Sequence, residues 1–166
     1  MATDIYLYFK EPNVPGDSED NENKDAIEIL TFSNGSSMPI TEGRSFAGSG
    51  TSGIANFGEF NFTKLADSAT VPLLKHVWEG THFKQVLVRC YRATGPNSRI
   101  CYLEITMEGA VIASVHLSAG SSGIPTEGYA IDYSKITYKY MDTDKVTGKS
   151  KNPQAISYNR LSNEIA

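Results

Sequence analysis

The sequence predicts a mainly β fold, a closed or nearly closed antiparallel β-barrel with one flanking α-helix at about residues 68–79. Short stretches of alternating apolar and polar residues recur at near-regular spacing along the 166 residues, as the strands of a barrel do. Only one stretch carries apolar residues at convincing helical spacing. Closure into a barrel would remove the exposed edges that this much β-structure otherwise presents.

The length fits a single domain over residues 1–166, long enough to bury a core without a metal or a disulfide. The first strand is expected at 4–10, and the second at 26–33. In the first strand, Ile5, Leu7 and Phe9 fall on one face, and Tyr6 and Tyr8 on the other. Between the two strands, the polar and acidic residues 11–25 predict a surface loop.

A long glycine- and serine-rich loop is expected at about 34–53, which reads NGSSMPITEGRSFAGSGTSG. Five glycines and five serines give it high backbone freedom. An aperiodic connection of this length is uncommon inside a compact domain. Met38, Ile40 and Phe46 offer apolar anchors. We therefore predict a loop that leaves the domain and packs on a neighbouring molecule; a flexible loop is the alternative.

Residues 54–64 resume the strand pattern, and the helix follows them. Asp67 or Ser68 can accept hydrogen bonds from the free backbone N–H groups of its first turn. Gly80 can end the helix in the left-handed conformation. A stripe expected to pack on the sheet consists of Val71, Leu74, Val77 and Trp78.

The rest of the chain is again β. Strands are expected at 83–92, 100–107, 110–117, 128–141 and 155–161. Glu108 and Gly109 should join the strands 100–107 and 110–117, and 128–141 should be one long, tyrosine-rich strand. Turns or flexible connections are expected at 94–98, 118–123 and 142–153.

Composition excludes several classes of function. The net charge is −4, with acidic and basic residues mixed along the chain, which argues against a nucleic-acid binder. No apolar stretch approaches the ~18 residues of a membrane span. The start of the chain lacks the features of a cleaved signal peptide, so we expect folding in the cytoplasm and any export by another route. Cys90 and Cys101 are expected to be buried free thiols; a cross-strand disulfide is the alternative.

The sequence shows no catalytic, cofactor-binding or metal-binding constellation. His76, His82 and His116 lie far apart along the chain. The glycine-rich residues 48–53 lack the lysine of a phosphate-binding loop. The acidic residues 17–25 lack the central glycine and final glutamate of a calcium loop, which favours a solvated loop.

Several segments, in this order, resemble the Hcp (hemolysin-coregulated protein) family of the bacterial type VI secretion system. They are DIYLYF, DAIEILTFS, SFAGSGTSG before FNFTKLAD, DSATVPLLKHVWEGTHF, and TEGYAIDYSKITYKY. Glu127 before a strand that contains Lys135 also fits the family pattern. Together the segments span nearly the whole chain.

The resemblance implies a ring-forming structural protein rather than an enzyme. Proteins of this family form six-membered rings that stack into the inner tube of an injection machine, carry effectors in the lumen, and are released from the cell. The implied partners are further copies of the chain, a spike protein, a contractile sheath and effector proteins, with no nucleic acid and no membrane insertion. Within the long loop, Ile40, Arg44 and Phe46 are the candidate contact residues.

Two other functions stay open at this point. The tyrosine-rich strand also suits a monomeric β-barrel that binds a small apolar or sugar ligand. A small hydrolase with a site assembled only in space is the third candidate.

Overall fold

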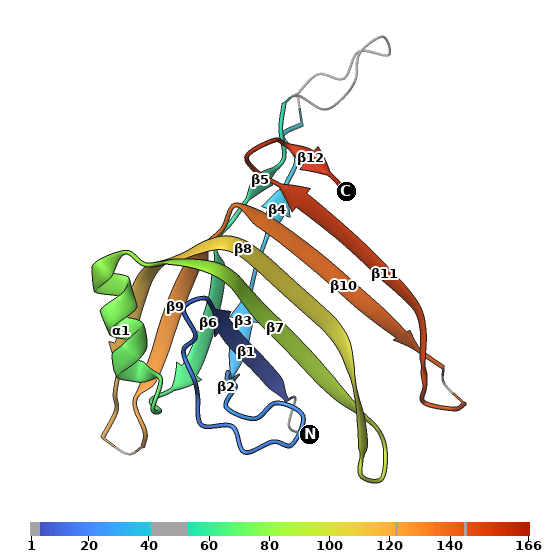
Figure 1. The fold of residues 1–166 in the computed structure, drawn as a ribbon, viewed down its shortest axis with the longest axis horizontal. Helices are drawn as coiled ribbons and strands as arrows, with labels where there is room; N and C mark the ends of the chain where they lie inside the picture. Colours follow the sequence, from blue (N-terminus) through green and yellow to red (C-terminus); the bar gives the residue numbers. More distant parts are fainter. Residues whose placement is uncertain (1–3, 41–52, 122, 145) are drawn as a thin grey trace.

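The computed structural model describes residues 4–40, 53–121, 123–144 and 146–166 (Figure 1). The elements of this part of the chain, in order, are β1 Ile5–Lys10, β2 Ile27–Glu28, β3 Thr31–Ser33, β4 Ser36–Ser37, β5 Asn56–Phe57, β6 Phe60–Leu65, α1 Thr70–Glu79, β7 His82–Gly95, β8 Ser98–Ser118, β9 Thr126–Asp132, β10 Lys135–Thr143, β11 Ser150–Asn159 and β12 Glu164–Ile165. The prediction of a mainly β fold with one helix is confirmed.

Ten strands form one antiparallel sheet that branches at β8. On one edge β8 pairs with β7, which continues to β1 and β2. On the other edge its first half pairs with β10, and its second half pairs with β9. Figure 1 shows the result: β7, β8, β10 and β11 run side by side as a long twisted sheet, while β6, β9 and α1 lie at one end of it. The short strands β4 and β5 form a separate hairpin stem.

Strand pairing does not close this sheet into a barrel, which corrects the predicted closed barrel. The pairing stops at β2 on one side and at β3 on the other. The expected single strand 26–33 is divided, because β2 pairs with β1 whereas β3 pairs with β6. Beyond β8, the strands β10, β11 and β12 extend outward as an open flap of sheet.

The strands around β8 also differ from the prediction. Residues 98–118 form one strand, with Gly109 inside it at a φ of +59°, instead of two strands joined there. Conversely, the expected long strand 128–141 is divided into β9 and β10. The turn occurs where the Ser134 N–H donates to the Glu108 carbonyl at 3.0 Å, so that β9 and β10 share one edge of β8.

The core lies between the two branches of the sheet and beneath α1. Fully buried side chains from six strands and the helix fill it, among them Leu7, Phe9, Ile27, Phe60, Phe62, Leu73, Phe83, Val86, Val88, Ile105, Met107 and Ile131. Aromatic rings pack in pairs, as Phe62 and Tyr129 do with ring centroids 4.9 Å apart. Buried side chains therefore occupy much of the space between the two branches of the sheet.

Helix α1 is rotated relative to the predicted stripe. Leu73 is its buried residue, and Val77 packs beside it on the core. Val71 and Trp78 point outward, and the Trp78 side chain is 80% exposed. Both sets of residues have helical spacing, so periodicity alone could not choose between them.

The ends of α1 lie close to those predicted. The helix begins at Thr70, and its N-cap is Ala69 instead of the predicted Asp67 or Ser68, without a hydrogen bond from the side chain of the cap residue. Asp67 Oδ1 instead accepts from the Ala69 N–H at 2.9 Å. Gly80 ends it with φ +64° and ψ +38°, as predicted for a left-handed cap. No helix in the described part of the chain is long and apolar enough to span a lipid bilayer.

A buried cation joins β6, β9 and the start of α1. Lys64 is fully buried, and its ammonium lies 2.5 Å from Glu127 Oε2 and 2.7 Å from Asp67 Oδ1. The ammonium also donates to the Leu65 carbonyl at 3.1 Å. Because buried charges need both counter-charges and hydrogen bonds, this cluster fixes the helix start against the sheet. Glu127, which the family pattern had singled out with Lys135, is therefore a buried partner of Lys64.

Glu127→Leu should destabilise the fold by about 3–5 kcal/mol, because it leaves the Lys64 ammonium buried with one counter-charge removed. Urea unfolding followed by circular dichroism, at a fixed protein concentration, measures the loss. The control is Glu108→Gln, which removes a pair with Lys135 at 3.5 Å between partly exposed side chains; it should cost less than about 1 kcal/mol. Equal losses in the two variants would contradict this role of Lys64.

Gly109→Ala should destabilise the fold by about 1–3 kcal/mol, because an alanine at positive φ is strained. A Cβ there would also lie 2.8 Å from Ser134 Oγ. The matched control is Gly128→Ala in β9, where an added Cβ meets no atom within 4 Å. If the two substitutions shift the urea midpoint equally, the bend in β8 does not depend on Gly109.

Candidate assembly surface

One apolar face of the sheet continues from the core onto strands where the described residues cover it only in part. Residues directly opposite one another on paired strands share a face. One such row runs across five strands as Leu7, Val88, Ile105, Tyr138 and Ile156. The first three are fully buried, Tyr138 is half-buried, and Ile156 is 55% exposed. The face that forms the core on β1, β7 and β8 is thus exposed at Ile156 on β11, whereas Tyr158 on the same strand packs against Phe57 of the β4–β5 stem, with ring centroids 4.6 Å apart.

The opposite face of the same strands is polar. The neighbouring row contains Arg89, Glu104 and Lys139, with Arg89 Nε 3.2 Å from Glu104 Oε2. The outer sheet is therefore two-sided, with a solvated face and an apolar face that lacks a second layer. Such a sheet needs a covering surface, because exposed contiguous apolar surface marks interaction sites.

An apolar groove of about 440 Å³ lies on the uncovered face, between the β4–β5 stem and the last strands. Its apolar lining consists of Met38, Ile54, Ala55, Phe57, Ile136, Tyr138, Ile156, Tyr158 and Ile165. The phenol of Tyr138 donates to Asn34 Oδ1, which ties β10 to the segment before β4. Burial raises the pKa of Tyr138 to about 12, so this phenol stays neutral at physiological pH.

The predicted contact residues belong to the segment beside this groove. Ile40 follows Met38, and its side chain is 60% exposed. Arg44 and Phe46 lie outside the described residues. The stem of the predicted loop is a hairpin, since Ser36 pairs with Phe57, and Ser37 with Asn56. The sequence predicted the loop but not the groove next to it. Alternating residues in 136–140 and 156–158 did indicate the apolar strand face that forms one wall of the groove.

The acidic loop 11–25 is fastened to the sheet rather than merely solvated. The Arg99 guanidinium binds Asp20 and lies 2.9 Å from Asp4 Oδ2, and it stacks over the Tyr91 ring at 4.9 Å. The buried Asn23 accepts from the Tyr91 hydroxyl at 3.1 Å. Most residues of the loop are exposed, in line with the solvated-loop prediction, but these contacts also make the loop a second layer over β1 and β7, on the face of the sheet opposite the core.

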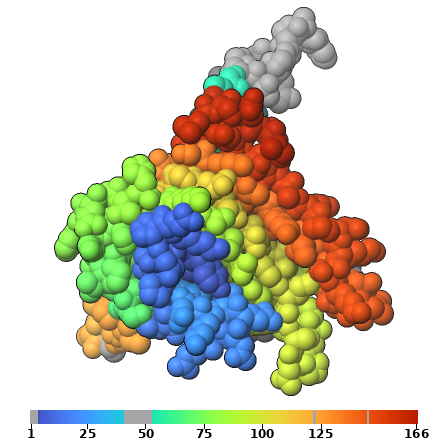
Figure 2. Space-filling model, in the orientation of Figure 1, coloured from blue at the N-terminus to red at the C-terminus, as the bar shows by residue number. Residues whose placement is uncertain are grey.

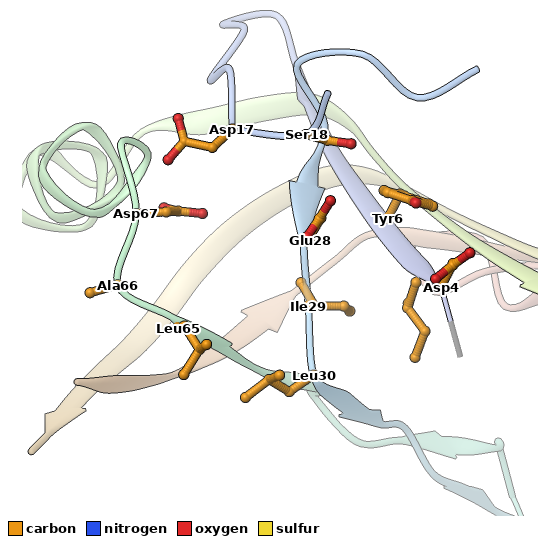
Figure 3. A pocket seen from close by; sticks show the side chains of 11 residues that line it. Asp4, Tyr6, Asp17, Ser18, Glu28, Ile29, Leu30, Leu65, Ala66 and Asp67 are labelled. Atoms are coloured by element: carbon orange, nitrogen blue, oxygen red, sulfur yellow. The ribbon is translucent and has the colours of Figure 1, made fainter. Parts of the chain in front are cut away.

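A second groove, of about 320 Å³, opens where this loop meets β2 and the end of β6 (Figure 3). Four carboxylates line it, from Asp4, Asp17, Glu28 and Asp67. Its apolar surface comes from Ile5, Ile29, Leu30, Leu65 and Ala66, and none of its eleven lining residues is a lysine or arginine. Hydrogen bonds from the Ser68 hydroxyl and backbone N–H lower the pKa of Asp17, so this carboxylate is ionised at neutral pH.

The histidines form no constellation in the described part of the chain. His76 packs against the Phe83 ring and shares a hydrogen bond with Thr81 Oγ1 at 2.9 Å, while His82 and His116 are exposed on different strands. No hydrogen bond between a histidine and a carboxylate or serine is present among these residues. The hydrolase candidate gains no support from this arrangement.

Both cysteines are free thiols, as predicted, but only Cys90 is fully buried. Burial raises the pKa of Cys90 to about 11, which keeps it protonated and unreactive. Cys101 is partly exposed and packs with Tyr6 and Tyr91.

Residues 6–140 match the family described as "Type VI secretion system effector, Hcp". The chain belongs to the Hcp family. Protein hcp1 of Pseudomonas aeruginosa is 28% identical over 162 residues, which cover 96% of each chain.

Solved structures have the same fold. A structure described as a type six secretion system protein superposes with a TM-score of 0.88 at 23% identity, covering 99% of this chain and all of the other. Hcp1 from Salmonella typhimurium superposes with a TM-score of 0.77 at 24% identity over the whole of both chains. The flap of β10–β12 and the β4–β5 stem are included in this coverage, so they belong to the Hcp fold.

Membership in the Hcp family confirms the predicted class of function: the chain is a type VI secretion protein, a tube subunit. Because a tube is built from many copies of one chain, neighbouring copies are available to cover the exposed apolar face.

Proposed function

We propose that six copies of this chain form a closed ring, and that such rings stack into the inner tube and carry effector proteins in the lumen. The supporting observation is the apolar sheet face that is core on β8 and exposed at Ile156 on β11. A second copy can cover it with a different part of its own surface. Repetition of this head-to-tail contact closes a ring of six when each copy is rotated by one sixth of a full turn relative to the previous copy.

We also infer a nearly closed barrel at one end of each subunit. The two residues between β2 and β3 continue the hydrogen bonding across the gap. The Ile29 N–H donates to the Ile5 carbonyl at 3.1 Å, and the Leu30 N–H to the Thr63 carbonyl at 2.7 Å. Segment 27–33 therefore bridges β1 and β6, and a rigid end of this kind suits a subunit that must hold its shape in a stack.

Ile40, Arg44 and Phe46 are proposed as contact residues between copies. The exposure of Ile40 beside the apolar groove supports its role. The roles of Arg44 and Phe46 rest on their place in the same loop. Spike, sheath and effector proteins are the proposed partners by family membership, and release from the cell follows the same route.

A ligand-binding monomer is the second candidate, because the groove of about 440 Å³ is largely apolar. The two functions differ in what covers Ile156 and Tyr138. In a ring, a neighbouring copy covers these two side chains, whereas in a binding module a small molecule covers them.

The purified protein should have a mass of about 109 kDa in solution, six times that of the 18.1-kDa chain. Native mass spectrometry or light scattering measures it, and negative-stain images should show rings with a central hole. A single-copy mass at high protein concentration would contradict the ring and favour the binding module.

Ile156→Lys should weaken assembly about tenfold or more, because it places a charge on the uncovered apolar face. The matched control is Ala155→Lys, one residue earlier on the same exposed strand, whose side chain belongs to the polar face. Ring formation against protein concentration is followed by sedimentation, with circular dichroism to verify folding. If the two lysines have the same effect, the apolar face is not the contact.

A further inference from the structure

Charge is segregated between the two ends of the chain. Residues 4–30 contain eight acidic and two basic residues, a net charge of −6. Residues 135–160 contain six basic and two acidic residues, a net charge of +4. The overall charge of −4 conceals this separation.

The two charged segments occupy different flanks of the molecule. In Figure 2 the N-terminal segment, in blue, covers the centre and lower centre of the visible face. The C-terminal hairpin, in orange and red, projects to the right. In Figure 1 the turn between β10 and β11 lies at the end of the flap, away from α1. A flank of one sign and a projecting element of the other sign suit a head-to-tail contact between identical molecules.

The acidic flank contains a groove with a suitable shape and lining. Asp17 and Asp67 lie on one side of it, and Glu28 and Asp4 on the other, while Leu30 and Leu65 form an apolar end (Figure 3). Within the described residues, Asp4 and Asp67 are paired with Arg99 and Lys64, respectively. Glu28 is exposed, and it forms no ion pair with any residue that the structure describes. The groove therefore presents negative charge beside exposed apolar side chains.

The β10–β11 hairpin carries the complementary groups. Val146, in its turn, has a side chain that is 92% exposed. Lys149 and Lys151 follow it, both exposed and neither in an ion pair with another described residue. Asp142 and Asp144 lie on the other side of the tip, where the Asp144 carboxylate is occupied by the backbone, accepting from the Val146 N–H at 2.7 Å. Val146 with Lys149 and Lys151 therefore matches an apolar floor flanked by carboxylates.

We propose that the acidic groove between β2 and β6 is the docking site for the β10–β11 hairpin tip of the adjacent copy. Val146 packs on Leu30 and Leu65, and Lys149 and Lys151 lie against Glu28 and Asp17. This inference rests on the proposed ring. Within that ring, the contact identifies the surface of the adjacent copy that covers the tip of the flap. The charges supply orientation and speed of association, while the apolar face supplies most of the burial.

Charge reversal on one side at a time tests the contact. The tip variant is Lys149→Glu with Lys151→Glu, and the groove variant is Asp17→Lys with Glu28→Lys. Each alone places like charges together at every contact, so assembly should weaken about tenfold or more. The control for the tip variant, Lys75→Glu with Lys84→Glu, makes the same change of −4 in net charge at two exposed lysines that line neither the groove nor the hairpin tip, and should assemble like the wild type.

Mixing the two reversed variants should restore rings. The acidic groove of the tip variant meets the basic tip of the groove variant, and the reversed tip meets the reversed groove. Alternation of the two closes in a ring with an even number of copies. Native mass spectrometry with one variant isotopically labelled should give three copies of each. Thermal melts verify folding; if the groove variant melts early, Glu28→Lys mixed with Lys151→Glu replaces the pair.

The outcomes separate the two proposals. Wild-type protein that stays monomeric overturns the ring itself. Wild-type rings together with rings from both reversed variants overturn only the docking of the hairpin in the groove. Loss of assembly that mixing does not restore, or a mixture in which the two variants combine at random, also overturns the docking.

Discussion

The structure depends on one constraint, that an apolar sheet face has to be covered. Strand β8 carries such a face along 21 residues, far more than one small core requires. Its middle residues Ile105, Met107, Ala110 and Ile112 line the core, and its pairing with β10 carries β11 out beyond the core. The bend at Gly109 allows one strand to serve both parts. The same alternation that forms the core therefore leaves an incomplete layer, and this incompleteness makes the chain a subunit.

The flap can remain intact only if the rest of the domain is rigid. The buried Lys64 cluster contributes here, since it joins the paired strands β6 and β9 to the start of α1. Arg99 has a similar role on the other side, where it holds the acidic loop over β1 and β7. In both clusters, charged and polar side chains at the edge of the core hold neighbouring segments in place without interrupting the apolar packing.

The sequence predicted the class of fold and most strands because alternation and turn residues are local signals. The prediction failed where the structure depends on which strand or helix packs against a residue. Gly109 looked like a turn, but its positive φ is a bend within β8, whereas the true turn at Ser134 had no glycine or proline to mark it. Val71 and Trp78 looked like core because their spacing is helical, and Leu73 and Val77 have helical spacing too. The grooves were not predicted, because each combines segments that lie far apart along the chain, residues 4–30 with 65–67 in one and residues 53–57 with 136–165 in the other.

Segregated charge bears on symmetry as well as on affinity. Two copies that met through the same surface would place net charges of −6 against −6, or +4 against +4, and would repel each other. Contact between unlike flanks avoids this repulsion and repeats in one direction, which yields rings instead of two-fold dimers. The charge pattern and the exposed apolar face thus both favour contact between different surfaces of identical copies. Electrostatic attraction acts at long range, whereas burial of apolar surface acts only on contact.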